Sequence, residues 1–205
     1  TPTNNFATFN PLYTPDPGNL STFSEGNLRI VSNSSSQKES GISTIGPSNG
    51  KWYAEFKLIA EASGESTCGV LYNSGTNTTY GLHGTYGYSV ASNGDSFDAG
   101  ASQGATNWSN TYTTNDIISV ALDLDNNRIT FAKNGSWTDG SGNWDESSPI
   151  AYFSLVASQD YFIGAGDKST SQSSTWDANY GNPPYANSSS VADANGYGAF
   201  EYAPP

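Results

Sequence analysis

The sequence predicts an all-β protein, an antiparallel two-sheet β-sandwich with long loops. Its 205 residues include 22 Gly and 13 Tyr, only seven Lys and Arg together, and no Met. Such a composition is typical of short strands joined by many turns. Apolar and polar residues alternate with a period of two in several segments, whereas no segment has the 3.6-residue apolar period of an ordinary amphipathic helix.

The segments before residue 60 predict the first strands. In 18–36, Phe23, Leu28 and Ile30 place apolar side chains on one face, and a serine-rich turn follows. A turn at Gly50 then precedes a half-buried strand. In that strand Trp52, Ala54, Phe56 and Leu58 alternate with Lys51, Tyr53, Glu55 and Lys57.

The middle of the chain is rich in loops, with short strands expected at 67–73 and 86–90. The clearest hairpin joins 116–125 to 128–135. The Asn126-Asn127 pair between its strands suits a type I′ turn, because asparagine tolerates positive φ. Asn134-Gly135 predicts the next turn, and Asp123 and Asp125 should face solvent because they alternate with leucines.

The last part of the chain predicts two more strands, in 149–158 and 160–166. From about residue 176 to 205 no long periodic segment remains. Its aromatic residues need burial, so we expect an ordered, loop-rich tail that packs on the domain. The whole of 1–205 is interpreted as one domain, with an N-terminal extension over about 1–20.

Charge and cysteine content exclude several classes of protein. The formal net charge is −12, so the chain would repel a phosphate backbone, and nucleic-acid binding is not expected. The single cysteine, Cys68, allows no internal disulfide and is interpreted as a buried strand residue. No apolar run approaches the roughly 18 residues that span a bilayer, so we expect no membrane insertion.

The sequence offers little catalytic chemistry. The only histidine, His83, lies between glycines, and no G-x-S-x-G motif is present to supply a nucleophile. We interpret His83 as a loop residue that bonds its surroundings or touches a ligand. The acidic residues are scattered, without the carboxylate cluster that a glycosidase needs. The expectation is therefore a protein that is not an enzyme.

No cofactor is expected, although calcium stays an alternative. The stretch Asp123–Asn127 resembles the start of an EF-hand loop, but Arg128 stands where that loop requires glycine. A looser calcium site could use the loop acids Asp139, Asp145 and Glu146. Acidic loops are more often simply solvated.

Aromatic residues in predicted loops are the best candidates for ligand binding. Trp or Tyr rings stack on sugars while polar neighbours bond the hydroxyls, and similar loops also bind proteins. Burial beneath the loops is the alternative, and for the strand residues Trp52, Tyr53 and Phe131 we expect a place in the core. The loop aromatics are Tyr72, Tyr80, Tyr86, Trp108, Tyr112, Trp137, Trp144 and Trp176. From these and their polar neighbours we predict a binding rim made of Tyr80, His83, Trp108, Tyr112, Trp137, Asp139, Trp144 and Asp145.

Three segments in order resemble the core of a SPRY domain. They are GKWYAEF at 50–56, DIISVALDLDNNRITFAKNG at 116–135 and PIAYFSLVAS at 149–158. Ser119 departs from the glycine usual in that family. The resemblance implies a bent, concanavalin-like β-sandwich that binds partners through loops at one end and is not generally an enzyme.

The ends of the chain resemble SPRY-type modules embedded in structural proteins of tailed bacteriophages, particularly marine ones. The matching text includes NNFATFNPL at 4–12 and ANYGNPPY at 178–185. The resemblance implies a virion surface, in a tail fibre or a capsid decoration, with similar text beyond the last prolines. Other virion proteins are then expected partners, and assembly would make binding multivalent.

The expected function is recognition of a host-cell surface glycan or protein by an extracellular virion module. A purely structural decoration or spacer domain and a glycan-cleaving enzyme of concanavalin-like fold are the two alternatives. An exposed aromatic cluster with convergent polar groups would favour recognition, an exposed apolar patch without a pocket would favour architecture, and two facing acids in a cleft would favour the enzyme.

Overall fold

The structure is a computed structural model that describes residues 5–13, 21–32, 39–72, 81–99, 101–104, 111–139 and 151–205. Its strands are β1 (Thr22–Ser24), β2 (Arg29–Val31), β3 (Ser40–Ile42), β4 (Lys51–Ala60), β5 (Ser66–Tyr72), β6 (Gly87–Ala91), β7 (Ser96–Asp98), β8 (Ala101–Gly104), β9 (Ile117–Asp123), β10 (Arg128–Lys133), β11 (Ser136–Trp137), β12 (Phe153–Ser154), β13 (Tyr161–Asp167) and β14 (Thr175–Asn179). One 3₁₀ turn, η1 (Gly81–His83), precedes β6. No helix long and apolar enough to cross a membrane occurs in these ranges.

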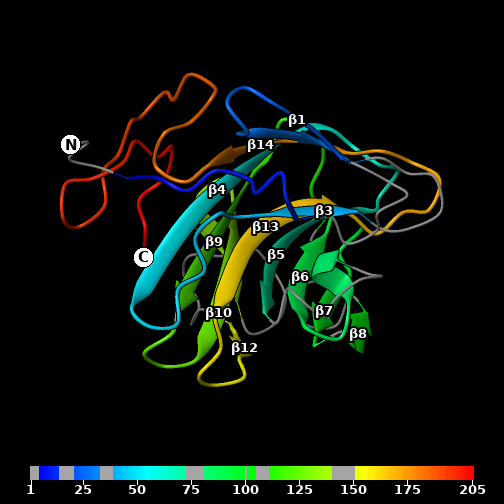
Figure 1. Cartoon of the computed structure of the whole chain (residues 1–205), viewed down its shortest axis with the longest axis horizontal. Coiled ribbons are helices and arrows are strands. Elements are labelled where there is room, and N and C mark those ends of the chain that lie inside the picture. Colours follow the sequence, from blue (N-terminus) through cyan, green and yellow to red (C-terminus); the bar gives the residue numbers. More distant parts are fainter. Residues whose placement is uncertain are drawn as a thin grey trace.

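The strands form two antiparallel sheets that pack face to face (Figure 1). The larger sheet has the order β1-β2-β14-β4-β9-β10-β11, with β12 also paired to β10. The smaller sheet has the order β3-β13-β5-β6-β7-β8. The predicted all-β, two-sheet sandwich is therefore confirmed.

The core lies between the sheets and follows the two-residue period. Ala54 and Phe56 of β4 stand opposite Val120 and Ile118 of β9, and all four are fully buried. Phe131 and Cys68 are also buried, as the sequence predicted. Burial raises the pKa of the Cys68 thiol, which suits a packing residue rather than a reactive one.

The predicted β9–β10 hairpin is present, but its turn differs from the prediction. Asp123 pairs with Arg128, so the loop has four residues, 124–127, and of these only Asn127 has positive φ (51°). A type I′ turn at Asn126-Asn127 is therefore wrong, because it needs two positive φ angles. Leu124 is buried, and its N–H donates to Gly50 O at 2.9 Å. The loop therefore begins at residue 124, two residues before the predicted turn.

The turn at Asn134-Gly135 is confirmed, and it has the type I′ geometry that was expected at Asn126-Asn127. Asn134 and Gly135 have φ of 50° and 86°, and their neighbours Lys133 and Ser136 are paired. Two central residues with positive φ match a type I′ turn. This turn leads β10 directly into β11.

The predicted loop-rich tail begins with a central strand. β14 lies between β2 and β4, and Trp176 is fully buried, so its interpretation as a loop residue is wrong. The indole Nε1–H of Trp176 donates to Gly166 O of the other sheet at 2.9 Å. Four of the five β14 residues are buried, and a strand covered on both faces does not alternate. The strand predicted in 149–158 is shorter than expected, because within the described part of that range, 151–158, only Phe153–Ser154 is a strand.

Candidate functional site

A broad groove of about 1120 Å³ lies at the end of the larger sheet where β4 and β10 begin and β9 ends. Strand residues form its floor, and three other parts of the chain line it. The C-terminal segment supplies residues within 193–205, the start of the chain supplies Asn5, Phe6 and Ala7, and the segment between β3 and β4 supplies Ser43, Ile45 and Pro47. Figure 1 shows the C-terminal segment in red beside the blue N-terminal one.

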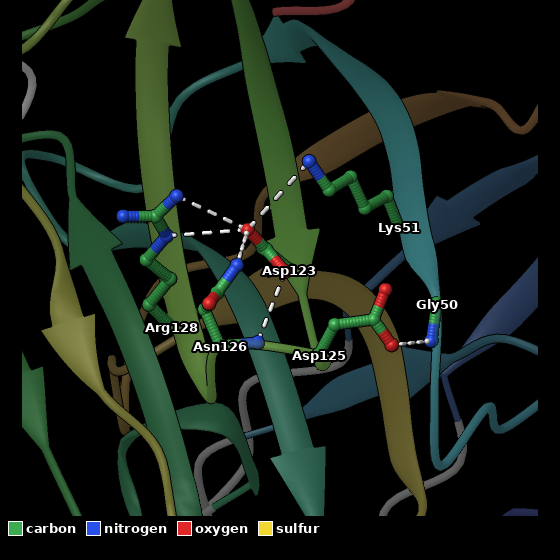
Figure 2. Close-up of polar contacts among 6 residues, drawn as sticks. All are labelled: Gly50, Lys51, Asp123, Asp125, Asn126 and Arg128. Atoms are coloured by element: carbon green, nitrogen blue, oxygen red, sulfur yellow. Dashed lines mark hydrogen bonds and ion pairs between the residues drawn. The ribbon is translucent and has the colours of Figure 1, made fainter.

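A row of charged residues crosses three strands at this end (Figure 2). Lys51 pairs with Asp123 across β4 and β9, and Asp123 pairs with Arg128 across β9 and β10. Nε and Nη2 of Arg128 each lie 3.2 Å from Asp123 Oδ2, and Lys51 Nζ lies 4.0 Å from it. Asn126 adds bonds of 3.1 Å from its N–H and 2.8 Å from its side chain.

These contacts fix the charge of Asp123. Burial alone would raise its pKa, but the hydrogen bonds from Asn126 and Arg128 and the charge of Lys51 outweigh burial and lower the pKa. Asp123 is therefore ionised at neutral pH. The neighbouring loop acid Asp125 accepts the N–H of Gly50 at 2.9 Å, which ties the hairpin tip to the start of β4.

Three large aromatic side chains in the groove are exposed. Trp52 is 43% exposed, Tyr197 is 52% exposed and Tyr152 is 54% exposed. The guanidinium carbon of Arg128 lies 5.4 Å from the centroid of the Tyr152 ring, a cation–π distance. The interpretation of Trp52 as a core residue is wrong, because β4 begins beyond the end of the packed core and the indole bonds only Asn49 O.

The wall formed by the C-terminal segment is anchored by Glu55, which the alternation of residues 51–58 predicts on the polar side of β4. Glu55 is fully buried. Its Oε2 accepts the N–H of Glu201 at 2.9 Å and the side-chain amide of Asn179 at 2.9 Å, and its Oε1 accepts the N–H of Tyr202 at 2.8 Å. The Tyr53 hydroxyl lies 3.0 Å from Oε1. Burial raises the pKa of Glu55, and these bonds oppose the shift.

A second, smaller hollow of about 580 Å³ lies beside the C-terminal segment. Trp137, one of the predicted binding residues, lines it together with the Asn134-Gly135 turn and 202–205. Trp137 is partly buried, and its ring centroid is 6.5 Å from that of Tyr53. Trp137 therefore lies beside the groove rather than in it.

The structure places three other predicted binding residues in protected positions. Tyr112 is buried, and its hydroxyl lies 2.7 Å from Ser66 O and 2.9 Å from Val90 O. His83 is buried in η1, with its ring centroid 5.6 Å from that of Phe97. Asp139 is buried just after β11. None of the three lines the groove, and in this conformation their side chains are not open to a ligand.

The remaining predicted residues lie outside the described residues. They are the ligand candidates Tyr80, Trp108, Trp144 and Asp145 and the calcium candidate Glu146. The rim that they would form stays a prediction, as does the calcium site. In the described part of the chain, no group of three or more His, Cys, Asp or Glu side chains is arranged to hold a metal ion.

Sequence reasoning missed the exposed aromatic residues of the groove, although a signal existed for two of them. Tyr152 precedes Phe153, which is buried, so a two-residue period places Tyr152 on the outer face. Trp52 follows the Gly50 turn by two residues, a position at the open end of a sheet. Nothing in the local sequence indicates that Tyr197 folds back toward them.

No family model matches the chain, and no curated protein matches its sequence. Its fold matches the SPRY domain of human HERC1 with a TM-score of 0.63 at 16% identity, over 83% of this chain and 96% of that one. The chain has a SPRY-like fold. It also matches the PSpry domain of TRIM65, with a TM-score of 0.57 at 14% identity over 85% of this chain and 92% of that one.

A third match is the structure of stonustoxin, with a TM-score of 0.56 at 15% identity. It covers 85% of this chain and 27% of that one. In the SPRY-like fold, the hairpin that carried the sequence resemblance, β9–β10, supplies the floor of the groove. Ser119, which replaces the usual glycine, is buried with its hydroxyl 2.9 Å from that of Tyr53.

Proposed function

We propose that this chain is a non-catalytic recognition module on the virion surface of a tailed bacteriophage, where it binds a component of the host-cell surface. The observation that carries the proposal is the groove with three exposed aromatic side chains, Trp52, Tyr152 and Tyr197. Large exposed apolar groups gathered in one hollow with polar neighbours are typical of binding sites.

The location on a virion is supported by the likeness of the chain's ends to modules of phage structural proteins. The SPRY-like fold is consistent with a recognition role, because domains of this type generally bind partners. A virion surface is extracellular and presents many copies, so weak single-site binding would be reinforced by multivalency. Other virion proteins are the expected partners for assembly.

Binding is favoured over glycan cleavage by the state of the carboxylates in the groove. A glycosidase needs a general acid with a raised pKa. The pKa of Asp123 is lowered, and its carboxylate is already bonded to Asn126 and Arg128. Asp193 accepts the N–H groups of Asn195 and Tyr197 at 2.9 and 2.8 Å. Both acids shape the groove and have the contacts of structural residues.

The test is binding of the purified domain, alone and displayed as an oligomer, to intact cells of candidate bacterial hosts, with and without calcium. Trp52→Ala probes the groove and Trp144→Ala probes the predicted loop rim. Val156→Ala is the matched control, because Val156 is as exposed as Trp52 (43%) but does not line the groove. We expect saturable binding that one of the two tryptophan variants weakens by at least about 1 kcal/mol.

The two variants also separate the two candidate surfaces. Loss of binding in Trp52→Ala assigns recognition to the groove, and loss in Trp144→Ala assigns it to the loop rim. Thermal unfolding of each variant controls for loss of the fold. If even the oligomer binds no host cell, the chain is a structural decoration domain and the proposal fails.

A further inference from the structure

We propose that the groove binds a neutral oligosaccharide, with Tyr152 as a stacking platform. The proposal rests on the recognition function and names its ligand. In the described part of the chain, the exposed large apolar side chains are Leu12, Trp52, Tyr152, Val156 and Tyr197. Three of the five line one groove, and all three are aromatic. Aromatic faces are the surfaces on which the apolar side of a sugar ring stacks.

The floor of the groove is built to accept a flat group. On the outer face of the larger sheet, Tyr53, Ala121 and Thr130 stand in register across β4, β9 and β10. Ala121 is the smallest of the three and lies between the other two, so the floor has a hollow at Ala121. All three residues line the groove.

Tyr152 is held in place before any ligand arrives. Arg128 lies over its ring at 5.4 Å, and the same guanidinium is fixed by two bonds to Asp123. Tyr152 remains 54% exposed, which leaves ring surface for a ligand. A ring already held in position loses little conformational entropy on binding.

The charges of the groove favour a neutral ligand. Among the described lining residues, the charged side chains are Lys51, Asp123, Arg128 and Asp193, two of each sign. Lys51 and Arg128 are both engaged with Asp123, while the whole chain carries −12. The lining charges sum to zero, so the groove has no net positive charge to attract a polyanion, and the whole chain would repel one. The same side chains offer donors and acceptors to neutral hydroxyl groups.

The size of the groove favours a chain of sugars over a single sugar or a protein. Its volume of about 1120 Å³ is slightly larger than that of most pockets for small ligands, roughly 300–1,000 Å³. The charged row spans β4, β9 and β10, two strand spacings of about 4.8 Å, and Tyr152, just before β12, extends the lining beyond β10. The centres of protein interfaces are depleted of charged residues, unlike this floor.

A glycan array tests the proposal. It should carry neutral hexose and N-acetylhexosamine oligosaccharides of one to six units beside uronic, sialylated and sulfated ones. The chain is assayed as wild type and as Tyr152→Ala, Tyr152→Phe, Ala121→Leu and Val156→Ala. We expect binding to neutral members that strengthens with length. Tyr152→Ala and Ala121→Leu should each weaken it by at least about tenfold, because one removes a stacking ring and the other fills the hollow.

Tyr152→Phe, which keeps the ring, and Val156→Ala, which lies outside the groove, should stay within about twofold of wild type. The proposal is overturned if only anionic glycans bind, if no glycan binds, or if Tyr152→Ala binds like wild type while remaining folded. If the chain binds host cells through the groove but binds no glycan on the array, the ligand belongs to another class, such as a protein. The recognition function would then stand and only the oligosaccharide proposal would fail. Failure in both assays would remove both proposals.

Discussion

At the scale of single residues, Asp167 is a buried acid at the end of β13. Burial raises its pKa to about 7, while hydrogen bonds from Ser32, Ser169 and Ser174 limit the shift and the charge of Glu65 adds to it. The folded chain therefore holds a proton at pH 5 that an unfolded aspartate, with a pKa near 3.9, has mostly lost. Since the folded state binds more protons between about pH 4 and 7, its stability falls as the pH rises through that window.

Asp167→Asn should remove this contribution to the pH dependence. The free energy of unfolding of the wild type should be higher at pH 5 than at pH 8, and the difference should shrink by about 2 kcal/mol in the variant. Urea unfolding at both pH values measures it. Other buried acids such as Glu55 contribute to the pH dependence of both proteins. Only the difference in pH dependence between wild type and Asp167→Asn therefore reports on Asp167. An unchanged pH dependence in Asp167→Asn would contradict the assignment.

At the scale of elements, the turn between β10 and β11 links the hairpin to the C-terminal segment. Gly135 has φ of 86°, and a Cβ on it would lie 2.7 Å from Cδ1 of the Tyr202 ring. Gly26 also has positive φ (67°), but a Cβ there would meet nothing within 4 Å. The two glycines therefore differ in packing while sharing the same backbone requirement.

Gly135→Ala should cost more stability than Gly26→Ala. The backbone strain alone costs about 1 kcal/mol in each, and the Tyr202 contact should add to it in Gly135→Ala. Chemical unfolding of both variants measures the difference. In a Tyr202→Ala background the extra cost should disappear, and equal losses in the two single variants would show that Tyr202 moves away freely.

At the scale of the whole molecule, two features join distant parts of the chain. Trp176 of the larger sheet bonds Gly166 of the smaller one, which fixes the sheets to each other through a buried indole. Glu55 fixes the C-terminal segment across the outer face of β4. The first feature holds the sandwich together, and the second builds the wall of the groove.

Two tryptophans of the larger sheet, Trp176 and Trp52, should therefore behave differently. Trp176→Ala should lower the free energy of unfolding by about 3–5 kcal/mol, because it empties a packed core site and breaks a buried hydrogen bond. Trp52→Ala should cost less than about 2 kcal/mol, because its side chain is 43% exposed. Urea unfolding of both variants provides the comparison, and similar losses would place Trp52 in the core after all.

Much of the fold could be predicted from local sequence. The period of two located β4, β9 and β10, because a strand with one face in the core tends to alternate. The glycines and asparagines of the turns were equally visible, since positive φ favours them. The same rule failed for β14, where cover on both faces removes the alternation.

The candidate site could be predicted only in part. The sequence by itself determined the sandwich, the hairpin and a negative charge that disfavours polyanions. Only the tertiary structure decided that Glu55 is buried, that Trp52 is exposed and that Tyr197 reaches the groove. These outcomes depend on the C-terminal segment crossing the face of β4, some 150 residues further along the chain than Glu55. Local propensity carries no information about such a contact, because it is made only when the whole chain has folded.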